Sequence, residues 1–166
     1  MSLKIPNVEA ILAVDSLYGL AKNGKIPWKS KTDMMFFRNI TIECVVVMGS
    51  KTLLSLPHSL PLKNRTNIVI TNEKEKYSNL YKDYNNYLIF LSLEETIQYI
   101  QSNNNNKIFI IGGNQIYNLL LPYCSNIWLT KMRQTYDCDL IFNYDISTYS
   151  KHLIYEDTEL EIMCLT

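Results

Sequence analysis

The stretch IFIIGGNQIY, from Ile108 to Tyr117, passes from a short apolar run through two glycines into a segment with helical spacing. The stretch VVVMGSKT, from Val45 to Thr52, has the same order. A β-branched run that ends in glycine and leads into a helix is typical of a parallel strand and its crossover helix. These two stretches therefore predict an α/β fold.

The same alternation extends along the chain. Strands are predicted wherever short apolar runs occur, at 8–14, 44–49, 67–71, 87–91, 107–112, 126–132, 152–156 and 160–165. Helical patterns lie between them, at about 32–40, 51–56, 93–101 and 114–120. We expect a mostly parallel sheet with helices on both faces, ending in an antiparallel hairpin. The polar segments 72–87 and 103–106 are expected to be solvated loops.

Size and composition restrict the function. A chain of 166 residues with 47% hydrophobic residues fits one domain, spanning 1–166. Lys plus Arg and Asp plus Glu are balanced at 16 each, so net charge recruits neither nucleic acid nor a membrane surface. The N-terminal MSLKIPNVEA lacks the apolar core of a signal peptide, and no apolar run is long enough to span a membrane. We expect a soluble, cytoplasmic protein.

The four cysteines are widely spaced and form no C-x-x-C pair. This pattern is typical of reduced thiols, and two histidines add little to a metal site. We therefore expect no bound metal.

Asp33 is the one acidic residue embedded in an apolar helical pattern. It lies in IPWKSKTDMMFFRNI (26–40), and Phe37 and Ile40 follow at i+4 and i+7 on the same face. One explanation is a capping box, because Ser30 and Asp33 have the S-x-x-D spacing. The other is a functional carboxylate in an apolar pocket. The residues alone leave both open.

Three other features suit a bound ligand. Gly49 and Gly112–Gly113 precede helix starts, where free N–H groups could meet phosphates, although tight turns explain them equally well. Arg65 could hold a carboxylate or could be solvated. The loop 19–28 has the composition of a mobile cover. One carboxylate, two anion sites and one arginine suit a reaction in which a cofactor supplies the chemistry.

Together these pieces resemble the dihydrofolate reductase family. The matching segments occur in order at 10–28, 32–41, 45–52, 59–71, 108–122, 127–132 and 137–142. The resemblance implies an eight-stranded mixed sheet with about four flanking helices and a C-terminal antiparallel hairpin. It also implies NADPH-dependent reduction of 7,8-dihydrofolate to tetrahydrofolate, which supports one-carbon metabolism and thymidylate synthesis. Hydride would pass to pterin C6, and Asp33 would promote protonation of N5.

The resemblance assigns roles by position. The catalytic group would comprise Asp33, Thr130 as the hydrogen-bond partner of its carboxyl, and Trp28 near the pterin. Substrate-binding residues would be Ile11, Leu12, Asp33, Met34, Phe37, Leu56, Leu62, Arg65, Ile111 and Tyr117. Cofactor-binding residues would be Ala13, Leu20, Gly24, Gly49, Ser50, Lys51, Thr52, Ile70, Thr71, Asn72, Gly112, Gly113, Asn114, Gln115, Ile116 and Tyr117. Gly112 and Gly113 match a pair joined by a cis peptide.

One departure concerns the 2′-phosphate of NADPH. Family members commonly place basic residues there, where this chain has Ser50, Asn72, Leu91 and Gln115, which leaves Lys51 as the nearby cation. We expect NADPH as cofactor with a narrowed preference over NADH.

Partners and alternatives follow from the same resemblance. The expected partners are dihydrofolate and antifolates such as methotrexate or trimethoprim, and we expect a monomer. The alternatives are a reductase of another heterocycle, as in riboflavin synthesis, and a silent folate- or nucleotide-binding protein. The sequence leaves open whether the chain was cut from a bifunctional protein with thymidylate synthase.

Overall fold

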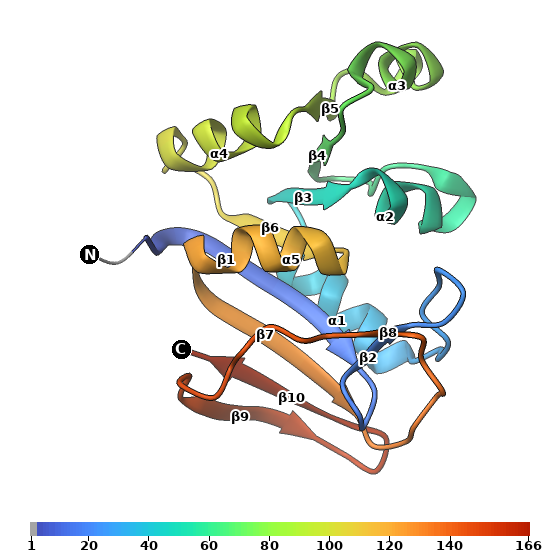
Figure 1. Cartoon of the computed structure of the whole chain (residues 1–166), viewed down its shortest axis with the longest axis vertical. Coiled ribbons are helices and arrows are strands. Elements are labelled where there is room, and N and C mark those ends of the chain that lie inside the picture. The colour runs from blue at the N-terminus through green and yellow to red at the C-terminus, as the bar shows by residue number, and fades with distance from the viewer. Residues whose placement is uncertain (1–2) are drawn as a thin grey trace.

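The computed structural model describes residues 3–166 and contains an eight-stranded sheet with helices on both faces (Figure 1). The strand order is β5-β4-β3-β6-β1-β7-β10-β9. The bounds are β1 Ile5–Val14, β3 Val45–Gly49, β4 Thr66–Ile70, β5 Leu88–Leu91, β6 Ile108–Gly112, β7 Cys124–Met132, β9 Lys151–Glu156 and β10 Leu160–Leu165. All eight predicted strands are therefore confirmed.

The sheet is parallel from β5 to β7, and β10 pairs antiparallel with both β7 and β9. The predicted mixed sheet and C-terminal hairpin are thus confirmed. A second sheet of two strands, β2 (Gly19–Ala21) and β8 (Leu140–Ile141), was not predicted. Strands this short are too brief to show a period of two.

Four α-helices form where the sequence predicts them: α1 Lys31–Thr41, α2 Ser50–Ser55, α4 Leu93–Ser102 and α5 Asn114–Leu120. A fifth, α3 (Lys74–Leu80), is followed by the 3-10 helix η2 (Lys82–Tyr84). Two further 3-10 helices are η1 (Pro57–Ser59) and η3 (Leu121–Tyr123).

The prediction of a solvated loop at 72–87 was wrong, because α3 and η2 form within it and bring the α-helices among residues 3–166 to five, where about four were expected. Tyr77 and Tyr81 recur at helical spacing in this polar segment. Their rings lie against Phe90 of β5, at centroid distances of 5.5 and 5.9 Å. An aromatic stripe of two residues therefore anchors a helix whose overall composition is that of a loop.

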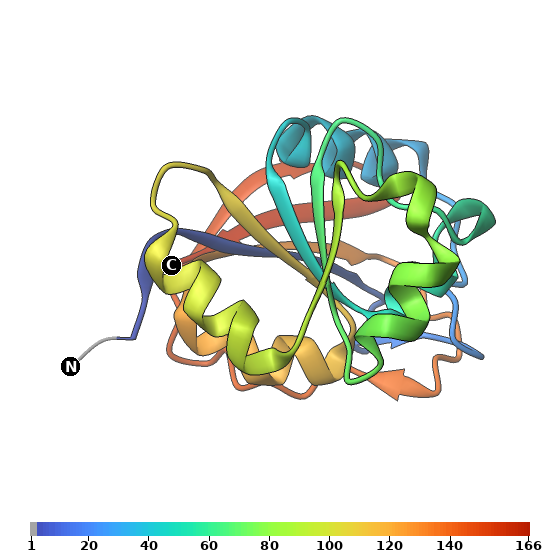
Figure 2. The ribbon, with the colours of Figure 1, turned by 90° about the horizontal axis from the view of Figure 1, so that it is seen from above.

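The sheet separates two hydrophobic layers, and Figure 2 shows α1 on one side with α4 and α5 on the other. Successive side chains of a strand point to opposite faces. On β1, Ile11 therefore packs in the α1 layer with Val46 and Phe109, whereas Leu12 packs in the α4–α5 layer. Within residues 3–166, no helix is long and apolar enough to cross a membrane.

Candidate active site

Asp33 lies in the first turn of α1, and only half of the predicted capping box forms around it. The Ser30 hydroxyl accepts a hydrogen bond from Asp33 N at 3.1 Å. On α4, by contrast, Ser92 and Glu95 make both halves of the box. The capping explanation is thus confirmed for the Ser30 side chain, but the Asp33 carboxyl takes no part in it.

The carboxyl of Asp33 points instead toward β7 and the Trp28 side chain. Burial raises the pKa of Asp33, and the negative charge of Glu159 adds to the rise. Hydrogen bonding to the buried Thr130 hydroxyl and the proximity of Trp28 act the other way. Since burial dominates, the balance that the sequence could not decide favours a raised pKa.

Trp28 shows that the site can take a further polar group. Its ring is buried beside Met132 and Leu160 and lies 5.3 Å from the ring of Tyr136. Its indole Nε1 is buried, and it has no hydrogen-bond partner among residues 3–166. A buried donor without an acceptor is costly, so this atom suits a ligand or a bridging water.

Apolar side chains from several elements gather in the α1 layer, and we call this group the slot. Phe37 of α1, Leu56, Leu62 and Ile111 of β6 are half-buried and pack on one core cluster with Ile11. These are five of the residues predicted to contact substrate. Met34, which was also predicted to contact substrate, is 67% exposed.

Tyr117 contacts both Ile11 of the slot and Gly112, which precedes the start of α5. Its buried hydroxyl donates to the carbonyl of Ile11 at 2.8 Å, and burial strongly raises its pKa, with Asp33 contributing. A Cβ on Gly112, whose φ is 115°, would meet the Tyr117 ring at 3.1 Å. Only glycine therefore allows the strand end and this ring to approach so closely.

The two glycine turns are neighbours in space. Met48 of β3 pairs with Gly112 of β6, so α2 and α5 begin side by side. The predicted cis peptide between Gly112 and Gly113 is present. A Cβ on Gly113 would project toward Thr52, with no atom nearer than 3.7 Å. This open backbone cradle lies between the two helix starts.

Arg65 is buried, being 9% exposed, rather than solvated. Its Nε donates to the carbonyl of Lys63 at 2.9 Å and its Nη1 to the hydroxyl of Thr41 at 3.0 Å. Burial lowers the pKa of Arg65, and the positive charge of Arg38 contributes. These two bonds fix the Arg65 guanidinium, Arg38 adds a second positive charge, and neither group has an ion pair among residues 3–166, so the pair suits an anion.

Comparison with known proteins identifies the family to which this chain belongs. The family model for dihydrofolate reductase matches residues 7–159. The chain belongs to the dihydrofolate reductase family. A dihydrofolate reductase from Heliothis virescens is 30% identical over 150 residues, which cover 84% of this chain and 80% of that protein. A bifunctional dihydrofolate reductase-thymidylate synthase from Paramecium tetraurelia is 32% identical, over 82% of this chain and 28% of its own length.

A solved dihydrofolate reductase has the same fold. The enzyme from Enterococcus faecalis, in complex with NADP(H) and RAB-propyl, superposes with a TM-score of 0.76 at 28% sequence identity. The alignment covers 95% of this chain and 94% of that one. The expected dihydrofolate reductase fold is therefore confirmed.

Not every predicted residue gathers at the slot. Leu12, Leu20 and Ile116 pack in the α4–α5 layer, so the slot can meet only their backbone. Gly24 is at the exposed tip of a turn closed by Lys22 and Lys25, with no atom within 4 Å of an added Cβ. The remaining predicted cofactor positions lie along the carboxyl ends of β1, β3, β4 and β6: Ala13, Ser50, Lys51, Ile70, Thr71, Asn72, Asn114 and Gln115.

The sequence reading missed three supporting residues. Thr41 accepts a hydrogen bond from Arg65. It lies two turns after Asp33 on α1, and this helical spacing could have placed it on the same face as Asp33. Phe36 packs against Trp128 at 6.1 Å between centroids. Asp15, at the start of the cover loop, accepts hydrogen bonds from the backbone N–H groups of Leu17, Gly19 and Tyr136.

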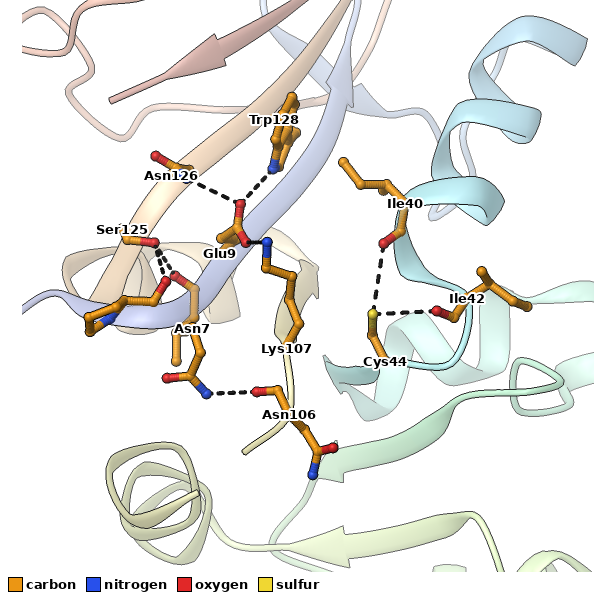
Figure 3. Close-up of polar contacts among 12 residues, drawn as sticks. Asn7, Glu9, Ile40, Ile42, Cys44, Asn106, Lys107, Ser125, Asn126 and Trp128 are labelled. Atoms are coloured by element: carbon orange, nitrogen blue, oxygen red, sulfur yellow. Dashed lines mark hydrogen bonds and ion pairs between the residues drawn. The ribbon is translucent and has the colours of Figure 1, made fainter. Parts of the chain in front are cut away.

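A second buried acid, Glu9, lies on β1 in the α1 layer (Figure 3). It is 1% exposed. Its Oε1 accepts from Trp128 Nε1 at 2.9 Å and from Asn126 Nδ2 at 3.2 Å, and its Oε2 pairs with Lys107 Nζ at 2.6 Å. All its partners are thus protein groups, one of them a cation.

Proposed function

We propose that the chain catalyses the NADPH-dependent reduction of 7,8-dihydrofolate to 5,6,7,8-tetrahydrofolate, with Asp33 as its proton-handling group. The observation that carries this proposal is a carboxyl of raised pKa on α1, without an ion-pair partner among residues 3–166, in the layer that holds the apolar slot. Membership of the dihydrofolate reductase family supports the same reaction. The rival same-fold reductase of another heterocycle is not favoured by these relatives.

The slot binds and orients the substrate. Phe37, Leu56, Leu62 and Ile111 provide apolar walls of the kind that planar rings occupy. Asp33 would accept hydrogen bonds from the pterin's 2-amino group and the adjacent ring nitrogen. Arg65 would take the α-carboxylate of the glutamate tail, and Arg38 adds positive charge at that end.

Proton transfer depends on the surroundings of Asp33. A raised pKa brings a carboxyl closer to the operating pH, where a general acid or relay is most effective. Thr130 orients the carboxyl by hydrogen bonding. The free Trp28 Nε1 would hold a water between the carboxyl and the pterin, through which a proton could reach N5.

The residues present fit NADPH, which supplies the hydride when bound. The Gly113 cradle leaves room for backbone to meet phosphate, and Thr52 offers a hydroxyl beside it. Tyr117 and the backbone of Ala13 would flank the nicotinamide. Lys51, exposed in the first turn of α2, would reach the 2′-phosphate with donors from Thr71 and Asn72.

The reaction is tested by following NADPH oxidation with and without 7,8-dihydrofolate. We expect substrate-dependent loss of NADPH and formation of tetrahydrofolate. A protein that binds both compounds without consuming NADPH would be a silent binding protein, and the proposal would be abandoned.

The cofactor assignment is tested with Lys51→Ala. Removing one charge-assisted contact should weaken NADPH binding about tenfold or more and leave NADH binding unchanged. Exposed Lys82 of η2, far from the helix starts, provides the control variant Lys82→Ala. An unchanged NADPH/NADH ratio would show that another group holds the 2′-phosphate.

Some expectations stay predictions from the sequence. These are a single domain over 1–166, a monomer in the cytoplasm, and inhibition by methotrexate or trimethoprim. The reductase of Enterococcus faecalis, complexed with NADP(H) and RAB-propyl, supports the wider expectation that small inhibitors occupy such a site.

A further inference from the structure

The turn after α2 has an unusual backbone. His58 and Ser59, within and at the end of η1, have φ angles of 58° and 54°. Left-handed conformation is unfavourable for a residue with a Cβ, and here two such residues follow one another. Backbone of this kind persists only where surrounding contacts hold it.

Ser59 takes part in three hydrogen bonds of this turn. Ser59 N donates to Leu56 O at 2.8 Å, and Ser59 Oγ donates to Leu54 O at 2.8 Å. The third comes from outside, since the hydroxyl of Tyr81 donates to Ser59 O at 2.7 Å. The first two bonds lie within residues 54–59, whereas the Tyr81 bond ties the turn to the segment 72–87. Further along the chain, Leu62 N donates to Asn67 Oδ1 and Leu62 O accepts from Asn67 Nδ2, which ties Leu62 to β4.

Tyr81 is itself held in place. Its half-buried ring lies 5.9 Å from Phe90 of β5 and 6.2 Å from Tyr84, by centroids. Burial raises the pKa of Tyr81, so its hydroxyl keeps its proton and remains a donor at neutral pH. The segment 72–87 therefore brings a fixed hydrogen-bond donor to the turn.

The turn is continuous with one wall of the slot. Leu56 precedes it and Leu62 follows it, and both pack on the core cluster that Phe37 and Ile111 also contact. Asp33, Thr130 and Trp28 lie on other elements. Because Leu62 is tied to β4 through Asn67, a displaced turn would move the Leu56 side of this wall and leave the acid and its partners unchanged.

We propose that Tyr81 is a positioning residue that sets the width of the dihydrofolate slot at the wall formed by Leu56 and Leu62. The inference rests on the proposed function, because the slot is the proposed substrate site. Since Asp33 receives the pterin, this wall meets the aminobenzoylglutamate part of the substrate. Tyr81 should then govern substrate affinity rather than the chemical step.

The test compares Tyr81→Phe with Tyr84→Phe, each of which removes one hydroxyl from the same aromatic cluster. No hydrogen bond from the Tyr84 hydroxyl is found within residues 3–166, so Tyr84→Phe is a matched control. Two substrates are used: 7,8-dihydrofolate, and 6-methyl-7,8-dihydropterin, which has no aminobenzoylglutamate tail. Circular dichroism and the NADPH dissociation constant check that each variant folds.

For Tyr81→Phe we expect the KM for dihydrofolate to rise about fivefold, the effect of one lost hydrogen bond. Its kcat, its KM for the tail-less pterin and its NADPH affinity should stay within about twofold of wild type. Tyr84→Phe should change none of these values.

Three results for Tyr81→Phe would overturn the inference. They are an unchanged KM for dihydrofolate, an equal rise in KM for dihydrofolate and for the tail-less pterin, or a fall in kcat with both substrates. A wild-type protein that reduces neither pterin would instead contradict the proposed function. In that event dihydrofolate binding, followed by quenching of tryptophan fluorescence, decides the role of Tyr81 by the same comparison.

Discussion

Asp33 and Glu9 are two acids in the same layer of the molecule, with opposite surroundings. Glu9 is buried within the sheet and has an ion pair with Lys107 and two neutral donors, Trp128 and Asn126. Asp33, on the helix that covers that sheet face, has no ion-pair partner among residues 3–166, and burial raises its pKa. The carboxyl of Glu9 thus has both a counter-charge and neutral hydrogen-bond donors, whereas the carboxyl of Asp33 lacks a counter-charge among residues 3–166.

The difference separates a structural acid from a functional one. A buried carboxylate that is paired and fully hydrogen-bonded holds elements together and is closed to ligands. An acid without a counter-charge costs stability, and natural proteins keep such groups where a substrate or a proton must be met. Glu9 is the more deeply buried of the two, and what separates them is the counter-charge that Lys107 gives to Glu9.

The largest expected effect comes from Asp33→Asn, which keeps the shape and removes the ionisable group. Turnover of dihydrofolate should fall at least about a hundredfold near neutral pH, since a positioned proton-transfer group is worth roughly that. NADPH binding should be unchanged. Steady-state kinetics and fluorescence titration measure the two, and near-normal turnover would remove Asp33 from the mechanism.

Relative to the wild type, the Asp33→Asn variant should become more stable as the pH rises. Because the pKa of Asp33 is higher in the folded than in the unfolded protein, the folded state binds more protons between the two values. The wild-type free energy of unfolding therefore falls as pH rises through this window, and stays lower above it. Urea unfolding of both proteins across this range should show that the free energy of unfolding of Asp33→Asn increasingly exceeds that of the wild type.

A second variant would put Glu9 in the situation of Asp33. Lys107→Met removes the cation and should lower the free energy of unfolding by about 2 kcal/mol, less than the roughly 3–5 kcal/mol of a fully buried pair. The reduction is smaller because the Lys107 side chain is 52% exposed. Turnover should stay near wild type.

The control is Lys76→Met, which breaks the exposed pair with Glu73. Its urea unfolding midpoint should be unchanged. Equal midpoints for the two lysine variants would mean that the Glu9 pair contributes no more than a surface pair.

The smallest effect is expected from Thr130→Val. It removes the hydrogen bond that lowers the pKa of Asp33, so the carboxyl should titrate at higher pH than in the wild type. NMR of protein with labelled aspartate carboxyls would follow this titration. Thr96→Val, a buried threonine of α4 in the other layer, should leave it unmoved.

The sequence predicted the sheet well because each strand is a β-branched run and each glycine turn marks a strand end. It failed at α3, where two tyrosines are outnumbered by polar neighbours. It also placed Leu12 among substrate contacts, although strand alternation turns that side chain to the other layer. The carboxyl of Asp33 was found by helical spacing, whereas its lack of a cation partner depends on residues distant in sequence.

The outermost strand, β9, also bears on how copies of this chain meet. All six of its residues are exposed, including Leu153, Ile154 and Tyr155. An exposed apolar edge invites a neighbour's strand to add to it, which leads to fibres. Here the ladder between β9 and β10 shifts register beside Leu153, and Lys151 and Glu156 carry charge at either end. Such an irregular border with charged ends is unfavourable for pairing with a further strand.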